Sequence, residues 1–272
     1  MDAGDDIAST EAFRDMTGWL LQQNLSVPRV LAARPDKGLL LLEDLGSQSV
    51  GTLLSDKAKT AEIYEACIQI LLLIRNAAAP VLTCPTAREF CEWTKLADQY
   101  YPGADTQLLD AFRRGLETIL ADCLIKPPTV SLRDFHVDNM MWLPDRTGIR
   151  RVGLLDYQDA ILTHPVYDLV SLLTDARTDV PRQVRQQLVQ RYSEVSGDDF
   201  DALSLAFAAF SVQRNLRILG IFHRSAVVDG KVHHLPKVPR VYGYLSEALE
   251  HPAFDDLGQL LRAALPPPDA NP

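Results

Sequence analysis

Three side chains in the stretch SLRDFHVDNMMWLPDRTGIRRVGLLDYQDA have types and spacing that allow joint chemistry: Asp134, Asn139 and Asp156. Asn139 and Asp156 lie about equally far in sequence from the turn-forming segment 145–148, so a hairpin folded there places them opposite each other. Asp134 lies in the preceding loop, which can curl back over the same mouth of the hairpin. The group offers one carboxylate to accept a proton and a carboxylate–amide pair for a hard cation such as Mg²⁺. That combination suits phosphoryl transfer to a hydroxyl.

These residues also fit a known motif. The segment Asp134–Asn139 fits D-x-H-x-x-N, and the segment Asp156–Asp159 fits D-[FY]-x-[DE]. Together they resemble the catalytic loop and metal-binding turn of the protein-kinase-like fold, in its aminoglycoside and choline phosphotransferase branch. The stretches LLDYQDAILTHPVYDLVSLLTDAR and QRNLRILGIFHRSAVVDGKVHHLPKVPRVYGYL look like bacterial cell-wall amino-sugar kinases, which phosphorylate the anomeric hydroxyl of N-acetylmuramate and N-acetylglucosamine. The resemblance spans roughly residues 10–262.

The resemblance implies a role for each matched residue, with ATP and Mg²⁺ as cofactors. Asp134 is expected to be the catalytic base, and Asn139 and Asp156 are expected to hold Mg²⁺. The hinge between the two lobes is expected to bind adenine through its backbone, at Glu43, Asp44 and Leu45. Structural support of the catalytic loop is expected from Arg133, His136 and Asp168, the last as a cap on the loop backbone.

Substrate recognition rests on weaker sequence signals. The candidates follow the metal-binding Asp or lie on the late helix and its exit: Gln158, Asp159, Arg214, Arg217 and Arg224. They could bond to sugar hydroxyls, an acetamido group or a lactyl carboxylate. The basic stretch QRNLRILGIFHR favours a neutral or anionic sugar. Two alternatives stay open: another small hydroxyl substrate, such as an aminoglycoside, choline or a homoserine-like metabolite, and a non-catalytic nucleotide-binding protein.

The sequence departs from the family pattern in two places. Leu132 stands where the family has His or a similar polar residue, two positions before the catalytic Asp. The larger departure is at the N-terminus, where a Gly-rich hairpin and a third strand should precede the first helix. Only Met1, Asp2 and Ala3 could be the end of that strand. We therefore expect a truncated N-terminal lobe without the phosphate-covering hairpin.

Hydrophobic periodicity predicts the elements that position these residues. A helix is expected at about 10–24 with Thr10 as its N-cap candidate, then a hairpin of strands at 27–33 and 38–45. A buried helix is expected from residue 60 onward. Further helical segments are expected at 86–100, 105–124, 166–177, 181–194, 199–219, 239–249 and 254–264, with strand-like runs at 129–132, 139–143 and 151–156. The fold class is α+β: a protein-kinase-like two-lobe fold with a partial N-terminal lobe at 1–44 and a large helical C-terminal lobe at 45–272.

Composition limits the possible partners and location. The 272 residues include 36 acidic and 27 basic side chains, giving a net charge of −9. A polyanion would be repelled, so no nucleic acid partner is expected. The first residues lack the basic and apolar regions of a signal peptide, and no apolar run approaches the roughly 20 residues of a membrane span, so no membrane partner is expected. The four cysteines form no C-x-x-C pair, and the sequence predicts a protein of the cytoplasm.

Overall fold

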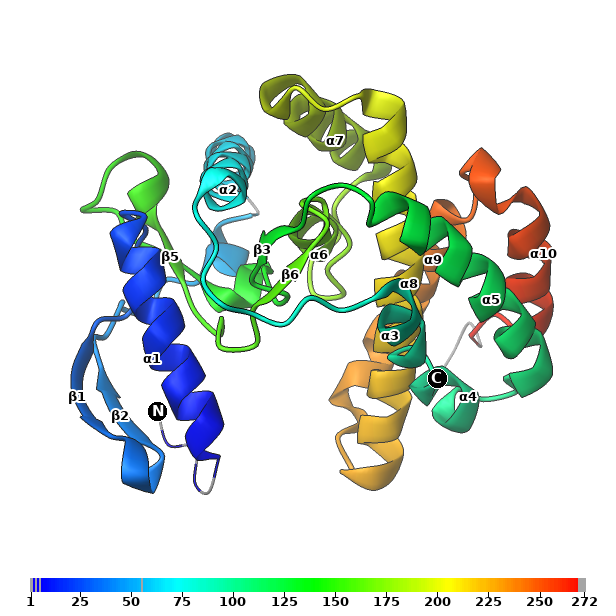
Figure 1. The fold of residues 1–272 in the computed structure, drawn as a ribbon, viewed down its shortest axis with the longest axis horizontal. Helices are drawn as coiled ribbons and strands as arrows, with labels where there is room; N and C mark the ends of the chain where they lie inside the picture. The colour runs from blue at the N-terminus through cyan, green and yellow to red at the C-terminus, as the bar shows by residue number, and fades with distance from the viewer. Residues whose placement is uncertain (1, 3, 5, 55, 269–272) are drawn as a thin grey trace. The chain divides into compact units, whose positions relative to one another are not determined.

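The fold was obtained as a computed structural model, which describes residues 2, 4, 6–54 and 56–268. The chain forms two compact units, each built from two stretches of sequence. Unit 1 contains Met1–Cys84 and Pro128–Leu172, and unit 2 contains Pro85–Pro127 and Leu173–Pro272. Figure 1 labels the elements of both units. These two units do not correspond to the lobes expected from the family resemblance, which meet between residues 44 and 45. That lobe boundary stays a prediction.

Unit 1 combines helices with short antiparallel strand pairs. Its helices are α1 (Ile7–Gln22), α2 (Lys57–Asn76) and α6 (Tyr167–Leu173). Its strands are β1 (Val30–Arg34), β2 (Leu39–Leu42), β3 (Thr129–Ser131), β4 (Met140–Trp142), β5 (Val152–Leu154) and β6 (Ile161–Thr163). The pairs are β1 with β2, β3 with β6, and β4 with β5. This mixture of helices and small sheets agrees with the predicted α+β class.

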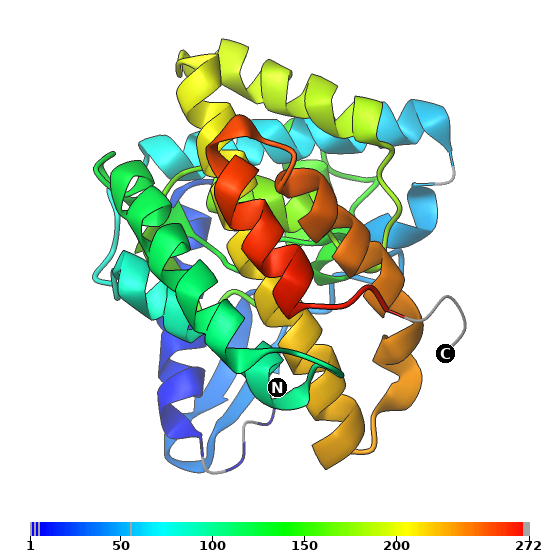
Figure 2. The ribbon, with the colours of Figure 1, turned by 90° about the vertical axis from the view of Figure 1, so that its right-hand side faces the viewer.

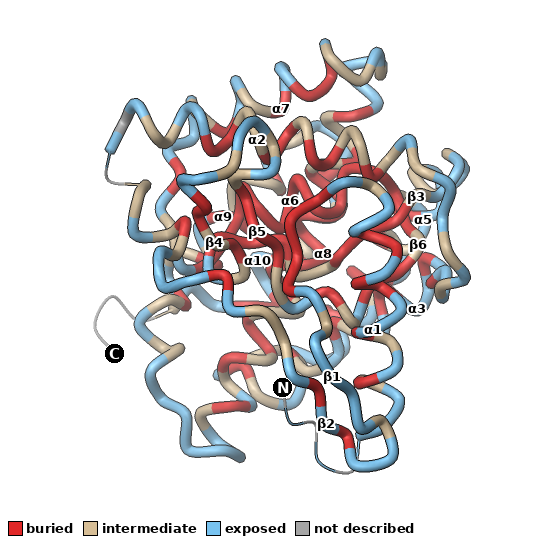
Figure 3. Tube along the Cα trace, turned by 90° about the vertical axis from the view of Figure 1, so that its left-hand side faces the viewer, coloured by how far each residue is buried: buried red, intermediate tan, exposed pale blue. Residues whose placement is uncertain are grey.

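The predicted hairpin at the start of unit 1 is present. β1 and β2 pair through Arg34 and Leu39, and Gly38 closes the turn with φ of 63°. The hairpin is mostly exposed, apart from the buried Leu40 of β2, whereas β5 and α6 are buried (Figure 3). An isolated antiparallel bridge joins Asp2 to Leu39, where the sequence suggests the end of a third strand. Met1 and Ala3 lie outside the described residues.

The first helix begins one turn earlier than predicted. The Asp6 carboxylate accepts a hydrogen bond from the Ser9 amide at 2.9 Å, so Asp6, not Thr10, is the N-cap. Thr10 lies inside the helix and is buried. An aspartate at this position satisfies one of the amides that a helix start leaves without a partner. The next long helix, α2, begins in the same way at Asp56, which accepts from the amides of Ala58 and Lys59.

The described regular elements of unit 2 are α-helices and short 3₁₀ helices. Its helices are α3 (Ala87–Glu92), α4 (Leu96–Tyr100), α5 (Thr106–Cys123), α7 (Arg182–Ser196), α8 (Phe200–Val228), α9 (Val238–Ala248) and α10 (Asp255–Ala264). The long helix α8 packs against α4, α5, α7 and α9, and α10 lies beside α5 (Figure 2). Short 3₁₀ helices in the two units are Pro35–Lys37, Val50–Leu53, Val137–Asn139, Gly148–Arg151, Val232–Lys237 and Pro252–Phe254.

Two helix predictions in unit 2 and one strand of unit 1 differ from the structure. The segment expected as one helix at 86–100 is divided into α3 and α4 by a turn, in which the Thr94 hydroxyl donates to the Cys91 carbonyl at 2.7 Å. Helix α8 continues nine residues past the predicted end at 219, through Gly220, to Val228. The strand β6 was not predicted. In the described part of the chain, the helices are too short or too polar to cross a membrane.

Candidate active site

A buried carboxylate fixes the loop that follows β3. Asp168, near the start of α6, is 2% exposed and accepts hydrogen bonds from the backbone amides of Leu132 and Arg133 at 2.7 and 3.0 Å. Its Oδ1 also accepts from the Ser131 hydroxyl at 2.7 Å. Three donors therefore hold the entrance of the loop formed by residues 132–139, hereafter the 132–139 loop. The role of Asp168 as a cap on a catalytic loop stays a prediction of the family resemblance.

Arg133 makes the sharp bend at the start of this loop. Its φ is 66°, in the left-handed region that residues other than glycine rarely adopt. Its amide donates to the Ser131 hydroxyl oxygen at 3.1 Å, its carbonyl accepts from the Ser171 hydroxyl at 3.1 Å, and its guanidinium donates to the Asp159 carbonyl at 3.4 Å. The surrounding bonds stabilise a backbone conformation that is unfavourable by itself.

Asn139 connects the 132–139 loop to the hairpin of β4 and β5. Its Nδ2 donates to the Asp134 carbonyl at 3.0 Å and to Asp156 Oδ2 at 3.3 Å. The Asp134 carbonyl also accepts from the His136 amide at 3.0 Å, and His136 is buried. The other carboxylate oxygen of Asp156 accepts from Gln158 Nε2 at 2.8 Å. The structure therefore brings Asp134, Asn139 and Asp156 to one mouth of the hairpin.

The hairpin register differs by one residue from the one inferred from the turn. Met140 pairs with Leu154, and the Asn139 carbonyl accepts from the Leu155 amide at 2.9 Å, so the partner across from Asn139 is Leu155. Asp156 nevertheless lies beside Asn139, because its φ of 57° bends the chain immediately after the strand. Asn139 and Asp156 do lie close together, as predicted. The left-handed turn at Asp156 brings them together, and they are not paired across the two strands.

Tyr157, directly after Asp156, anchors this turn to α1. Its ring is fully buried and stacks on Phe13 with a centroid distance of 4.7 Å. Its hydroxyl is 2.8 Å from the Thr17 hydroxyl, and burial raises the pKa of the phenol above its ordinary value. Tyr157 is the aromatic residue of the D-Y-Q-D motif, and its buried contacts fix the backbone next to the exposed Asp156.

The predicted hinge segment is held by ion pairs at its first residue. Glu43 pairs with Arg29 at 2.9 Å and with Arg146 at 3.4 Å, and the hydrogen bond from Arg29 holds the pKa of the Glu43 carboxyl below its usual value. The Gly46 amide donates to the Asp44 carboxylate at 2.8 Å. Glu43, Asp44 and Leu45 all line a pocket of about 360 Å³ in unit 1. Within the described residues, the Leu45 amide has no hydrogen-bond partner.

The five predicted substrate residues are divided between the units. Gln158 and Asp159 lie in unit 1, where Gln158 bonds to Asp156 and Asp159 is exposed. The three arginines lie on α8 in unit 2. Arg214 is buried, Arg217 lies 5.7 Å from the centre of the Trp93 ring, and Arg224 is 3.5 Å from Asp229. Their role toward a substrate stays a prediction.

Two contributors to the site were not predicted. Ser131 bonds both to Asp168 and to the Arg133 amide, and Ser171 bonds to the Arg133 carbonyl. Ser131 is adjacent to the predicted loop, and Ser171 is three residues after Asp168, one helical turn along α6. A search for hydroxyls one turn from the predicted cap would have found Ser171.

The arrangement has the chemistry of an oxygen-donor site. Among the described residues, no group of three or more His, Cys, Asp or Glu side chains gathers to hold a metal ion. The Asp156 carboxylate and the side-chain oxygen of Asn139 are hard oxygen donors that lie side by side at the mouth of the hairpin. The Asp134 carbonyl is held by two donors, the Asn139 side chain and the His136 amide. A proton acceptor beside an oxygen-ligand pair suits transfer of a phosphoryl group.

Comparison with known proteins agrees with this chemistry. Residues 2–206 match the phosphotransferase enzyme family. An N-acetylmuramate/N-acetylglucosamine kinase of Caulobacter vibrioides is 35% identical over 266 residues, which cover 91% of this chain and 72% of the relative. A kinase of the same name from Neisseria meningitidis serogroup B is 30% identical over 238 residues, which cover 81% of this chain and 70% of the relative.

Solved structures support the fold. A choline/ethanolamine kinase family protein from Mesorhizobium loti has a TM-score of 0.65 at 15% identity, covering 96% of this chain and 83% of that chain. An aminoglycoside phosphotransferase of Streptomyces rimosus, solved with ADP and streptomycin, has a TM-score of 0.55 at 20% identity, covering 77% of this chain and 84% of that chain. These likenesses confirm the predicted protein-kinase-like fold.

Proposed function

The chain belongs to the phosphotransferase enzyme family, and we propose that it is an ATP-dependent kinase for N-acetylmuramate and N-acetylglucosamine, acting on the anomeric hydroxyl in cell-wall recycling. The observation that carries this proposal is the 35% identity, over 91% of the chain, to a kinase named for these two sugars. The geometry of the 132–139 loop agrees with it, because the residues that a phosphotransferase needs lie together there.

ATP is proposed to bind at the hinge segment, with adenine against the backbone of Glu43, Asp44 and Leu45. The Leu45 amide supports this role, since within the described residues it is a donor with no partner. The pocket that these three residues line has room for a planar base. The ADP found in the Streptomyces rimosus enzyme is consistent with nucleotide use in this fold.

Mg²⁺ is proposed to be held by Asn139 and Asp156. The donor set fits a hard cation: Asp156 is exposed and carries charge, and the Asn139 amide nitrogen is occupied by the Asp134 carbonyl and Asp156, which leaves its oxygen available as a ligand. When bound, the ion would neutralise charge on the phosphate oxygens. Gln158 orients the carboxylate for this role through its bond to Oδ1.

Asp134 is proposed to accept the proton of the sugar hydroxyl as that oxygen attacks the γ-phosphorus. A base must be positioned before it is useful, and the Asp134 backbone is held through its carbonyl by Asn139 and His136. Asp168 holds the loop entrance, so Arg133, His136 and Asp168 act as positioning residues. Phosphoryl transfer needs little else from the protein than positioning and charge neutralisation.

We propose that Gln158 and Asp159 of unit 1 help to bind the acceptor, and the arginines of α8 in unit 2 remain separate candidates for this role. Other hydroxyl substrates of this fold, such as aminoglycosides and choline, are the alternative acceptors. We place the reaction in the cytoplasm, which agrees with four free cysteines: Cys67, Cys84, Cys91 and Cys123. No nucleic acid or membrane partner is part of the proposal.

The proposal is tested by following γ-phosphoryl transfer from labelled ATP with Mg²⁺ to a panel of acceptors. The panel contains N-acetylmuramate, N-acetylglucosamine, kanamycin and choline, and a methyl glycoside of N-acetylglucosamine as the matched control without an anomeric hydroxyl. We expect transfer to the first two sugars and none to the methyl glycoside. Transfer only to kanamycin or choline, or to no acceptor, would contradict the proposed substrate.

A further inference from the structure

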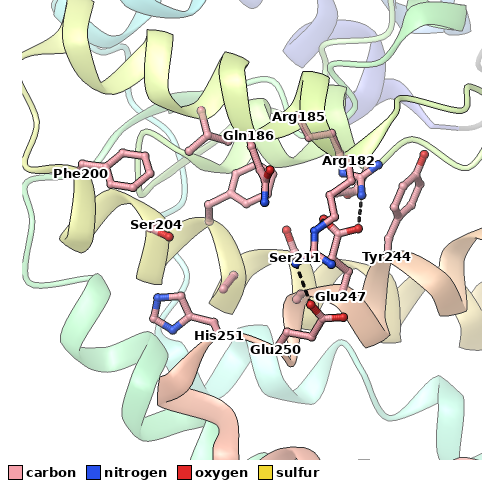
Figure 4. Close-up of a pocket in the computed structure, with 15 residues that line it drawn as sticks. Arg182, Arg185, Gln186, Phe200, Ser204, Ser211, Tyr244, Glu247, Glu250 and His251 are labelled. Atoms are coloured by element: carbon pink, nitrogen blue, oxygen red, sulfur yellow. Dashed lines mark hydrogen bonds and ion pairs between the residues drawn. The ribbon is translucent and has the colours of Figure 1, made fainter.

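Unit 2 contains a pocket that the proposed reaction does not use. It has a volume of about 390 Å³ and lies among α7, the first half of α8 and the end of α9 with the residues that follow it (Figure 4). We call it the α7–α8 pocket. None of the site residues predicted from the sequence is among the described residues that line it.

The charges around the α7–α8 pocket neutralise one another. Arg185 is buried, donates to the Val180 carbonyl and to Glu247, and lies 4.7 Å from the centre of the Tyr244 ring. Arg182 pairs with Glu250 at 2.7 Å. Burial lowers the pKa of the His251 imidazole below its ordinary value, which favours the uncharged form. With two cations paired to two anions, the pocket has no net charge to attract an ion.

One polar group in the pocket lacks a partner. Ser211 lines the pocket, is 1% exposed, and its hydroxyl has no hydrogen-bond partner among the described residues. A buried hydroxyl without a partner is unfavourable, so this position is suited to a bond with a molecule that enters the pocket. Beside it the lining is apolar and aromatic, with Val189, Phe207 and Ala208, while Gln186 offers an amide at the exposed edge.

We propose that the α7–α8 pocket is a second ligand site, which binds an uncharged ring compound that carries hydroxyl or amide groups. The ring lies against the apolar lining and a polar group bonds to the Ser211 hydroxyl. Neutral sugars and nucleosides share this chemistry. A charged ligand is disfavoured, because an anion would meet Glu247 and Glu250 and a cation would meet Arg182 and Arg185.

Binding is tested by calorimetric titration of the full chain with two probes, methyl N-acetyl-β-glucosaminide and adenosine. Saturating Mg²⁺, ADP and N-acetylmuramate are present throughout, because these ligands occupy the proposed active site and, being charged, are disfavoured in the α7–α8 pocket. The two probes distinguish a sugar from a nucleoside. Gln186→Trp places a large ring at the exposed edge of the pocket, and Gln187→Trp is its matched control, the same change one residue along α7 at an exposed position outside the pocket. Ser211→Ala removes the unpaired hydroxyl.

We expect at least one probe to bind with a Kd of about 1 mM or tighter. Gln186→Trp should weaken this binding at least about tenfold, and Ser211→Ala about three- to tenfold, while Gln187→Trp leaves it within about twofold. Without ligand, Ser211→Ala should keep or raise Tm, because it removes a buried group without a partner. Failure of both probes to bind, binding that survives Gln186→Trp, or a Tm lowered by more than about 3 °C in Ser211→Ala would overturn the proposal.

Discussion

A single buried carboxylate, that of Asp168, accepts three hydrogen bonds from the segment that leads into the 132–139 loop. Hydrogen bonds to an ionised acceptor are stronger than those to a neutral one. Removing this acceptor takes the partner from the Leu132 amide and the Ser131 hydroxyl, and it leaves the Arg133 amide with the Ser131 oxygen alone. The loop conformation, including the left-handed φ of Arg133, therefore depends on one side chain.

Asp168→Ala should lower the free energy of unfolding by about 2–4 kcal/mol, because buried donors lose a charged acceptor. Asp168→Asn should lower it less, since the amide oxygen can still accept from part of the set. Urea denaturation followed by circular dichroism measures both, with the exposed Asp122→Ala as control. A loss below about 1 kcal/mol in Asp168→Ala would show that the loop has another support.

Asp134→Asn should keep the fold and nucleotide binding but reduce kcat by about 10²–10⁴, the usual contribution of a positioned proton acceptor. The change is nearly isosteric, so the bonds of the Asp134 backbone remain. Steady-state kinetics with N-acetylmuramate measures the effect. Asp138→Asn, an exposed neighbour in the same loop, is the control and should stay near the unmutated rate. If Asp134→Asn keeps more than about a third of the rate, Asp134 is not the base.

The close crossing of α4 and α8 in unit 2 depends on a glycine. A Cβ at Gly220 of α8 would lie 2.5 Å from the Ala97 nitrogen and 2.6 Å from the Leu96 carbonyl carbon of α4, so backbone atoms would have to move. Gly220→Ala should lower the free energy of unfolding by about 1–3 kcal/mol or more. The control is Gly243→Ala on α9, where nothing lies within 4 Å, and it should raise stability by about 0.5–1 kcal/mol. Equal effects of both changes in thermal denaturation would contradict this packing argument.

The ion pair of Glu43 and Arg29 should make the hinge segment sensitive to pH. The pKa of Glu43 is lowered in the folded protein by the hydrogen bond from Arg29, so this group stabilises the fold above its unfolded pKa of about 4.5. That stability is lost as the pH falls through the lower, folded pKa. Glu43→Gln should therefore be less stable by about 0.5–1 kcal/mol at pH 7, a small effect because Arg29 is mostly exposed. Denaturation at pH 7 and pH 3 checks this, and a difference that is not smaller at pH 3 than at pH 7 would contradict it.

The sequence predicted the helices and the hairpins well where periodicity is strong, and the misses have particular causes. The helix predicted at 199–219 stops before Gly220, whereas Gly220 lies inside α8 and allows a close contact with α4. β6 pairs with β3, which is distant in the sequence, so no hairpin turn joins the two strands and marks β6. Asp156 was expected opposite Asn139, but its left-handed φ depends on the tertiary contacts of Tyr157. Contacts between distant segments, such as those of Ser131 with Asp168, leave no local pattern.

At the scale of the whole molecule, Mg²⁺ and ATP should raise Tm together, since a ligand that binds only the folded state stabilises it. Asp156→Ala should remove the dependence on Mg²⁺, because it deletes the charged member of the proposed ligand pair, whereas Asn139→Ala should weaken it less. Thermal denaturation with ATP, with and without Mg²⁺, measures the shift. Equal shifts with and without Mg²⁺ in the unmutated protein would refute the proposed metal pair.

Unit 1 is built from two stretches, and this has a consequence during synthesis on the ribosome. Helix α2 belongs to the first stretch and contacts β3 and β5 of the second, and its Ile63, Ile68 and Ile70 are fully buried. About 90 residues must be translated between Cys84 and Leu172, which takes roughly 5–20 s. During that interval the apolar side of α2 has no strands to cover it. A nascent chain halted near residue 127 should therefore recruit chaperones that shield apolar segments, and one extended past residue 172 should release them.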